Sequence, residues 1–267
     1  MQLSISHRTT YRYERPVKYT AQALRLTPRR DGGQRVLAWS IQAPGRRSEQ
    51  IDAHGNVTHL LTLDTPHRQI DISVTGTVEV PEPQAVLPDA GPLSPLAYLA
   101  PTPLTAPDEQ ISRLAAQHLS GAGTLRERLL ALAAGVCARV RYRPGVTRVD
   151  DPAAMALARG EGVCQDQAHV MIACCRAFGV PARYVSGYLC SGAADGSASH
   201  AWVDLWLSEA NAWQSLDVTH VTPPGPGHCR LAIGRDYLDA APVRGVRRGG
   251  GEESMDVRVS AHGVESQ

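Results

Sequence analysis

Three side chains in the second half of the chain have the residue types of a nucleophilic centre: Cys164, His200 and Asp217. A thiolate attacks carbonyl carbon, an imidazole can take the proton of the thiol, and a carboxylate can orient the imidazole. The three residues are far apart in the sequence. They can act together only if the predicted helices and strands bring them within hydrogen-bond reach.

Cys164 lies at the start of a predicted buried helix. In the segment GVCQDQAHVMIACC it directly precedes a run that is apolar on nearly all sides, and Gly179 and Pro181 end this run. The unpaired N–H groups and the dipole at a helix N-terminus stabilise an anion, which here is a thiolate or an oxyanion. This segment alone leaves two interpretations open, catalysis and simple packing, because inert buried cysteines are common.

His200 and Asp217 lie on a predicted β-hairpin. The segment SHAWVDLWL alternates along its length, with large apolar groups on both faces, and therefore predicts a central strand that begins near His200. SEANA at 208–212 predicts the turn, and WQSLDVTH predicts the returning strand, although the register stays open. Each of the two residues alone is more simply interpreted as structural. A cysteine, a histidine and an aspartate on a helix start and its neighbouring hairpin are a much rarer combination.

Other residues compete for these roles. His169 follows Cys164 by little more than one helical turn, and we expect it to be structural. His220 is a rival partner for the thiol because it lies at the end of the strand that carries Asp217. A zinc site is a further alternative, and it would use Cys164, His169, Cys190 and His200. The spacing of these residues matches no recognised ligand pattern, and no C-x-x-C pair occurs. We therefore predict no metal and no other cofactor.

The chain is predicted to contain two regions of different character. Residues 1–88 hold four alternating segments separated by turn residues, which indicates an antiparallel sheet or a β-sandwich-like domain. Residues 89–107 form a proline-rich, stiff linker. Residues 108–267 begin with helical patterns, one of which opens with Thr124 and Glu127 in capping-box spacing, and continue with strand patterns. Helices followed by strands indicate an α+β fold.

Composition narrows the class of partner. The 267 residues carry a formal net charge of +1, which argues against nucleic acid because a nucleic-acid surface normally leaves a basic excess. The first residues lack the apolar stretch of a signal peptide, and no window is long and apolar enough to span a bilayer. We therefore predict a cytoplasmic protein with reduced cysteines and neither a nucleic-acid nor a membrane partner.

These residues resemble the bacterial branch of the transglutaminase-like superfamily. The matching segments are GEGVCQDQAHVMIACCRAFGVPARYVSGYL, SHAWVDLWL and LDVTH, in the order of the superfamily's Cys, His and Asp elements. Upstream, RTTYRYERPV, LRLTPR, RVLAWSIQAPG and DAHGNVTHL resemble the β domain that precedes the catalytic domain in this branch. Near the other end, RDYLDAAPVRGVRRGGGEE resembles its C-terminal part.

The resemblance implies a papain-like core and a thiol enzyme that forms an acyl-enzyme. Carried over residue by residue, Cys164 is the nucleophile, His200 the general base and acid, and Asp217 the orienting acid. The chain departs from the family at Gln167, where an aromatic residue is frequent, and at His220 and its neighbours, where D-P-T-N is frequent. We predict hydrolysis of a peptide, amide or isopeptide bond. Transfer to an amine and a non-catalytic binding role remain alternatives, and the oligomeric state is open.

Overall fold

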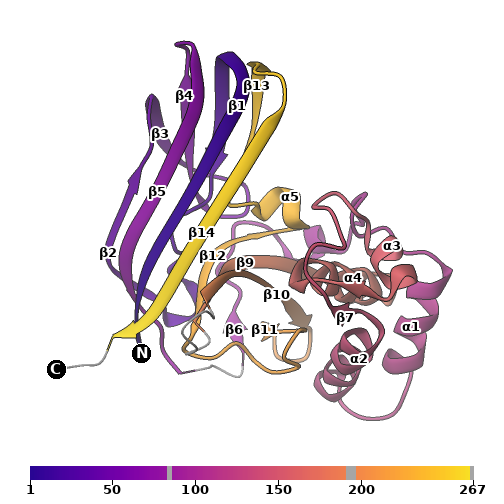
Figure 1. The fold of residues 1–267 in the computed structure, drawn as a ribbon. Helices are drawn as coiled ribbons and strands as arrows, with labels where there is room; N and C mark the ends of the chain where they lie inside the picture. Colours follow the sequence, from indigo (N-terminus) through magenta and orange to yellow (C-terminus); the bar gives the residue numbers. More distant parts are fainter. Residues whose placement is uncertain (83–85, 191–196, 265–267) are drawn as a thin grey trace.

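The protein consists of two antiparallel sheets, with helices packed against the second (Figure 1). The computed structural model describes residues 1–82, 86–190 and 197–264. This arrangement confirms the predicted α+β class, with an antiparallel strand domain at the N-terminus and a helix-and-sheet unit after it.

The first sheet is organised around one very long strand, β1 (Gln2–Leu24). Its buried residues alternate with exposed ones over most of its length, as a strand with one covered face requires. The register shifts between Arg12 and Val17, so the two halves of β1 have different neighbours. Five strands lie in the order β2-β5-β1-β4-β3, and the other four are β2 (Arg35–Gln42), β3 (Arg46–Ile51), β4 (Val57–Leu63) and β5 (His67–Glu79).

The C-terminal part of the chain returns to this first sheet. Strands β13 (Val243–Gly249) and β14 (Glu253–Val264) both pair antiparallel with β1. The boundaries 1–88, 89–107 and 108–267 stay a prediction, but the pairing differs from the expectation that everything after residue 108 belongs to the second unit. Local alternation cannot reveal such a partner, because the paired residues lie more than 200 positions apart in the sequence.

The second sheet and its helices form the other unit. Its strands lie in the order β12-β9-β10-β11-β6, which makes β10 central, as predicted. The strands are β6 (Leu87–Pro88), β9 (Ala182–Cys190), β10 (Ser197–Leu207), β11 (Ala212–Leu216) and β12 (His228–Gly234). The helices are α1 (Glu109–Leu119), α2 (Leu125–Arg139), α3 (Ala153–Arg159), α4 (Cys164–Ala177) and α5 (Tyr237–Ala240). Short 3-10 turns occur at Asp31–Gly33 and Pro95–Tyr98, and β7 (Arg141–Tyr142) pairs in parallel with β8 (Glu161–Gly162).

The helix starts follow the local sequence signals. Thr124 and Glu127 form the predicted capping box of α2, and Asp108 caps α1 by accepting a hydrogen bond from the backbone of Ile111 at 2.8 Å. Gly160 ends α3 in the left-handed conformation. These caps mark where α1 and α2 begin and where α3 ends.

Helix α4 is the core of the second unit, as its apolar sequence predicts. Every residue from Asp166 to Arg176 is buried, and the apolar ones pack with α1, α2 and the inner face of β10. A fully buried Val, Ile or Met side chain contributes about 1.5–3 kcal/mol. The helix therefore has little freedom to move, and its N-terminal residue Cys164 is held on a rigid support.

Residues 87–98, which include the start of the proline-rich segment, pack on the second unit. Strand β6 adds to the edge of that sheet by pairing with β11, and Tyr98 is buried edge-to-face against Trp213, with ring centroids 5.5 Å apart. The segment thus covers a sheet edge that would otherwise expose unpaired backbone groups.

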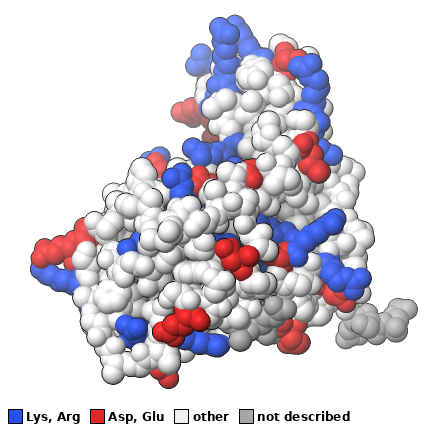
Figure 2. Space-filling view, turned by 180° about the vertical axis from the view of Figure 1, so that it is seen from behind, with Lys and Arg blue, Asp and Glu red and all other residues white. Residues whose placement is uncertain are grey.

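The surface carries its charges unevenly. Figure 2 shows Lys and Arg side chains gathered at the upper end of the first sheet, and acidic and basic side chains mixed over the rest of that view. Among the helices in the described ranges, none has the length and apolar character needed to cross a bilayer.

Candidate active site

Cys164 is the first residue of α4 and is partly exposed. The turn before it is held by Asp166, whose Oδ2 accepts hydrogen bonds from the backbone N–H of Val163 and the hydroxyl of Thr147, both at 2.7 Å. Gly162 makes room for this carboxylate, because a Cβ at that position would lie 2.7 Å from the Cβ of Asp166. The helix thus begins at Cys164, where first-turn N–H groups have no partner within the helix.

His200 lies between Cys164 and Asp217. Its Nε2 is 2.8 Å from Oδ2 of Asp217. The imidazole of His200 also makes a hydrogen bond with the thiol of Cys164. The register explains the first contact. Val203 pairs with Leu216, so Asp217 continues opposite Trp202, diagonal to His200 on the same face of the hairpin. The structure therefore brings together the three side chains that the sequence singles out.

Asp217 is fully buried, and its two oxygens accept hydrogen bonds from backbone and side-chain donors. Its Oδ1 accepts from the backbone N–H groups of Thr219 at 3.0 Å and His220 at 3.2 Å. Its Oδ2 contacts three imidazoles, those of His200, His220 at 2.7 Å and His228 at 3.0 Å. A buried carboxylate with this many donors is stable as an anion.

His220 reaches Asp217 because the strand is shorter than predicted. Strand β11 ends at Leu216, and the chain then turns, closed by two backbone hydrogen bonds between Asp217 and Thr222 at 2.8 and 3.2 Å. Val221, inside this turn, has a φ of 54°, a conformation that is costly for a β-branched residue. The turn directs His220 back onto the carboxylate, with about half of its side chain exposed.

His228 has a defined tautomer. Its Nδ1 accepts a hydrogen bond from the backbone N–H of Gly225 at 3.0 Å, so its proton is on Nε2, where it donates to Asp217. His228 comes from β12, outside the hairpin, and its ring stands edge-on to Trp202 at 5.4 Å. Nothing in the local sequence pattern around His228 indicates this contact.

The electrostatics favour a charged imidazole beside a charged carboxylate. Burial disfavours the charge on His200, but its hydrogen bonds with Asp217 and Cys164 outweigh burial and raise its pKa to about 9. Burial alone would likewise raise the pKa of Asp217, yet the hydrogen bonds from His200 and His228 hold that pKa well below its usual range. His200 therefore retains its proton at neutral pH.

The competing assignments have a different geometry. His169 is buried, and its Nε2 accepts a hydrogen bond from the backbone N–H of Tyr237 at 3.0 Å. Burial lowers the pKa of His169 to about 4, so this ring is neutral. Within the described ranges, the side chains whose ligand atoms lie within 4.8 Å of one another are His200, Asp217 and His228, which is not the zinc set considered from the sequence.

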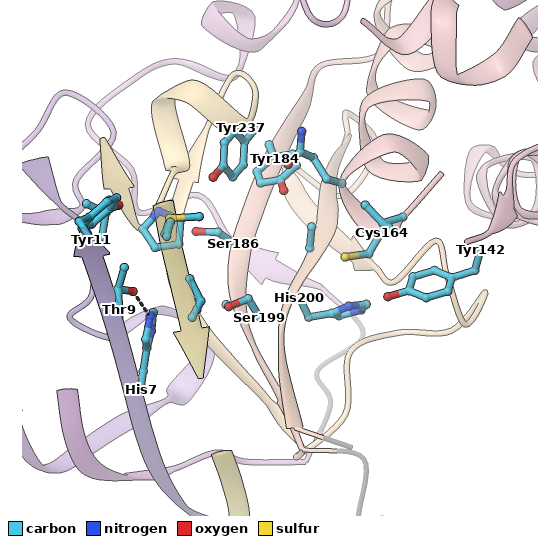
Figure 3. A pocket seen from close by; sticks show the side chains of 18 residues that line it. His7, Thr9, Tyr11, Tyr142, Cys164, Tyr184, Ser186, Ser199, His200 and Tyr237 are labelled. Atoms are coloured by element: carbon cyan, nitrogen blue, oxygen red, sulfur yellow. Dashed lines mark hydrogen bonds between the residues drawn. The ribbon is translucent and has the colours of Figure 1, made fainter. Parts of the chain in front are cut away.

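A cleft of about 350 Å³ opens beside Cys164 and His200. Tyr142 also lines this cleft, and Figure 3 shows its hydroxyl directed toward the imidazole of His200. Burial and the nearby Cys164 raise the pKa of Tyr142, so its phenol keeps its proton. Sequence reasoning missed Tyr142, and the only available signal was an aromatic residue within the polar stretch RVRYRPG that precedes the Cys164 segment.

The Gln167 departure from the family pattern has a structural role. Its side-chain amide donates to the backbone carbonyl of Val140 at 2.8 Å and accepts from the hydroxyl of Thr219 at 2.7 Å. Gln167 therefore connects α4 to the turn that follows Asp217, and it ties the helix of the thiol to the loop of the acid.

A cysteine at the start of a central helix, joined through an imidazole on the neighbouring sheet to a buried carboxylate, defines a papain-like arrangement. The chain belongs to the transglutaminase-like superfamily. Residues 112–218 match the model of that superfamily, and residues 3–79 match the bacterial transglutaminase-like N-terminal region. The two matches fall on the two units described above.

The similarity to sequence relatives and to a solved structure covers nearly the whole chain. Uncharacterized proteins from Mycobacterium leprae and Mycobacterium tuberculosis are 31% and 32% identical, over 96% of this chain and 97% and 90% of theirs. The crystal structure of a proposed cysteine protease from Cytophaga hutchinsonii is similar with a TM-score of 0.81, over 100% of this chain and 92% of that one, at 23% identity. That likeness supports the fold over the full length of the chain.

Proposed function

We propose that this protein is a thiol-dependent hydrolase that cleaves a peptide, amide or isopeptide bond through an acyl-enzyme. The observation that carries the proposal is the position of His200, which is hydrogen-bonded to both Cys164 and Asp217 at the edge of a cleft. A non-catalytic binding module has no need for this arrangement. The support is geometric and chemical, and the relatives are themselves uncharacterized.

In the proposed acylation step, the thiolate of Cys164 attacks the carbonyl carbon of the substrate. A C–S bond forms and the carbonyl electrons move to oxygen. The imidazolium of His200 then gives its proton to the leaving nitrogen as the C–N bond breaks, which releases the amine and leaves a thioester. Asp217 stabilises the imidazolium before this transfer and holds the ring in place.

In the proposed deacylation step, water takes the place of the amine. His200, now neutral, accepts a proton from water while the water oxygen bonds to the carbonyl carbon. The C–S bond breaks, the acid leaves, and the pair returns to thiolate and imidazolium. An added amine can react in place of water, so the products in the presence of an amine distinguish a hydrolase from an acyl transferase.

We propose two hydrogen-bond donors for the oxyanion in this mechanism. The backbone N–H of Cys164 is one, since it is at the N-terminus of α4. We assign the second to the phenol of Tyr142, which is held at the end of β7 through its parallel pairing with Gly162 on β8. Because the pKa of this phenol is raised, it remains a donor under the conditions in which the thiol reacts.

The test is turnover of a library of amide and isopeptide substrates by Cys164→Ala, with Cys190→Ala as the matched control. Both cysteines are free and partly exposed, but only Cys164 is in contact with His200. We expect Cys164→Ala to lose turnover and to keep its fold, and Cys190→Ala to keep both. Turnover of Cys164→Ala near the wild-type level would rule out the thiol mechanism.

We also keep the cytosol as the proposed location. All six cysteines are free thiols, including the neighbouring pair Cys174 and Cys175, and free thiols are typical of a reducing compartment.

A further inference from the structure

The wall of the cleft that faces Cys164 comes from the first sheet. Figure 3 shows Tyr11, Thr9 and His7 along β1, across the cleft from Cys164 and His200. Strand β14 completes the wall, because Thr9 pairs with Val257 and Tyr11 with Met255. We name the surface formed by His7, Thr9, Tyr11, Met255 and Val257 the sheet wall. Strands from the beginning and the end of the sequence thus both contribute to it.

The alternation of both strands keeps their charges off the sheet wall. Arg8, between His7 and Thr9, points to the other face and bonds to Asp71 at 3.1 Å. On β14, Asp256 and Arg258 form an ion pair with each other at 3.0 Å and do not line the cleft. Lys and Arg side chains gather at the upper end of the same sheet (Figure 2). The absence of charged side chains from the sheet wall is therefore a local property of this sheet.

Apart from Cys164 and His200 themselves, the titratable groups of the cleft are neutral. Both ring nitrogens of His7 are hydrogen-bonded, one to the hydroxyl of Tyr188 at 2.6 Å and the other to the hydroxyl of Thr9 at 2.8 Å. Burial lowers the pKa of His7 to about 4. Burial also raises the pKa values of the lining tyrosines Tyr184 and Tyr237. Among the described residues that line the cleft, none is Asp, Glu, Lys or Arg.

We infer that the sheet wall selects substrates in which the group beside the reacting carbonyl is uncharged. A charged group that packs on this wall loses its hydration and finds no counter-ion there, whereas an apolar or amide group loses little. Met255 and Val257 offer apolar contact, and Thr9 offers a hydroxyl. The volume of about 350 Å³ is at the small end of ligand clefts. This inference rests on the proposed function and names its substrate class.

The experiment measures alkylation of Cys164 by three haloacetamides of equal length that end in a methyl, a carboxylate or an ammonium group. This readout requires no turnover. In the wild type we expect the neutral reagent to react at least about tenfold faster than either charged one. Met255→Lys and Met255→Glu place opposite charges on the sheet wall. We expect each to raise the relative rate of the oppositely charged reagent by about threefold or more.

Val246→Lys is the matched control, since Val246 is an exposed apolar residue of the same sheet that does not line the cleft. The inference is overturned if the wild type shows no preference for the neutral reagent, if the two Met255 variants change all three rates equally, or if Val246→Lys causes the same change. Charge-dependent labelling without turnover of any amide would instead contradict the proposed function and leave the selectivity of the sheet wall standing. Where turnover is found, kcat/KM for neutral substrates should exceed that for charged analogues by about 100-fold.

Discussion

Asp217→Asn is expected to lower both the stability and the activity of this protein. Papain-like enzymes use asparagine in the place of the acid, so an amide can orient a histidine, but Asp217 accepts hydrogen bonds from more groups than His200 alone. Both oxygens of Asp217 accept hydrogen bonds, two from backbone N–H groups on Oδ1 and three from imidazoles on Oδ2. Whichever way the amide is turned, its NH₂ faces at least two of these partners.

The magnitude follows from the same contacts. A buried donor left without an acceptor costs about 1–3 kcal/mol, so two of them place the loss of stability at roughly 2–6 kcal/mol. If the NH₂ faces His200, it also favours the neutral tautomer with the proton on Nδ1, which cannot take the proton of Cys164. In a serine protease, the corresponding change from aspartate to asparagine lowers the rate by about 10⁴. We expect a loss of about 10²- to 10⁴-fold here, with activity still detectable.

The charge of Asp217 also determines a pH dependence. In the wild type the pKa of His200 is raised from its ordinary value of 6.5 to about 9. Because the folded pKa is raised, the charged imidazole contributes about 3 kcal/mol of stability below pH 6.5, and this contribution is lost as the pH rises through 9. In Asp217→Asn the pKa of His200 should fall toward its ordinary value, and the contribution should end at a correspondingly lower pH.

The assay is kcat/KM against pH, together with denaturant unfolding at pH 6 and pH 10. We expect the alkaline fall of kcat/KM to move from near pH 9 to near pH 7 in Asp217→Asn, and the stability difference from wild type to be larger at pH 6 than at pH 10. Asp71→Asn is the control, because Asp71 is a hydrogen-bonded acid on the first sheet, away from this site. An unchanged alkaline limit together with a rate within threefold of wild type would refute the role of Asp217.

Three further changes test other parts of the site. His200→Ala should move the pH profile of Cys164 alkylation by iodoacetamide to higher pH, whereas His220→Ala should not. The reason is that His200 is hydrogen-bonded to the thiol, while His220 is bonded to Asp217. A shift in His220→Ala alone would make His220 the partner of the thiol. Tyr142→Phe should lower kcat by about 10²-fold with little change in KM, and an unchanged kcat would remove its phenol from the oxyanion site. Gly162→Ala should lower the free energy of unfolding by about 1–3 kcal/mol, because the new Cβ meets the carboxylate of Asp166. Gly121→Ala is the control, because a Cβ there meets nothing within 4 Å. Equal unfolding midpoints for the two variants would contradict this prediction.

Much of the fold could be predicted from local patterns. The alternation of β1 and β10, the capping box of α2 and the apolar run of α4 are each visible within a short stretch of residues. The pairing of β13 and β14 with β1 could not be predicted in this way. A strand pattern states that a strand exists, and its partner depends on the path of the whole chain. The sequence of β14 does alternate between Met255 and His262, but this pattern carries no information about which strand it pairs with.

The candidate site likewise contains residues that the local sequence indicates and one that it does not. Cys164 and His200 are each marked by the element in which they lie, and Asp217 by the hairpin that returns to His200. The register was open from the sequence because the turn length alone allows several pairings, and the pairing of Val203 with Leu216 resolves it. His228 comes from another strand, so no spacing rule within the hairpin could have indicated it.

Trp202 separates two buried carboxylates that differ in the kind of partner they have. Asp204, two positions along the same face of β10, is bonded to Arg230 at 2.7 Å and Arg183 at 2.8 Å. A guanidinium does not release its proton, so this cluster has one charge state and can serve only as structure. The partners of Asp217 are imidazoles, which can gain and lose protons. The ring of Trp202 lies 6.1 Å from that of His200 and 6.0 Å from the guanidinium of Arg230, between the fixed cluster and the one that can change. The rigid ion pairs therefore hold β10 in place from one side of the indole, while on the other side the proton on His200 remains free to move.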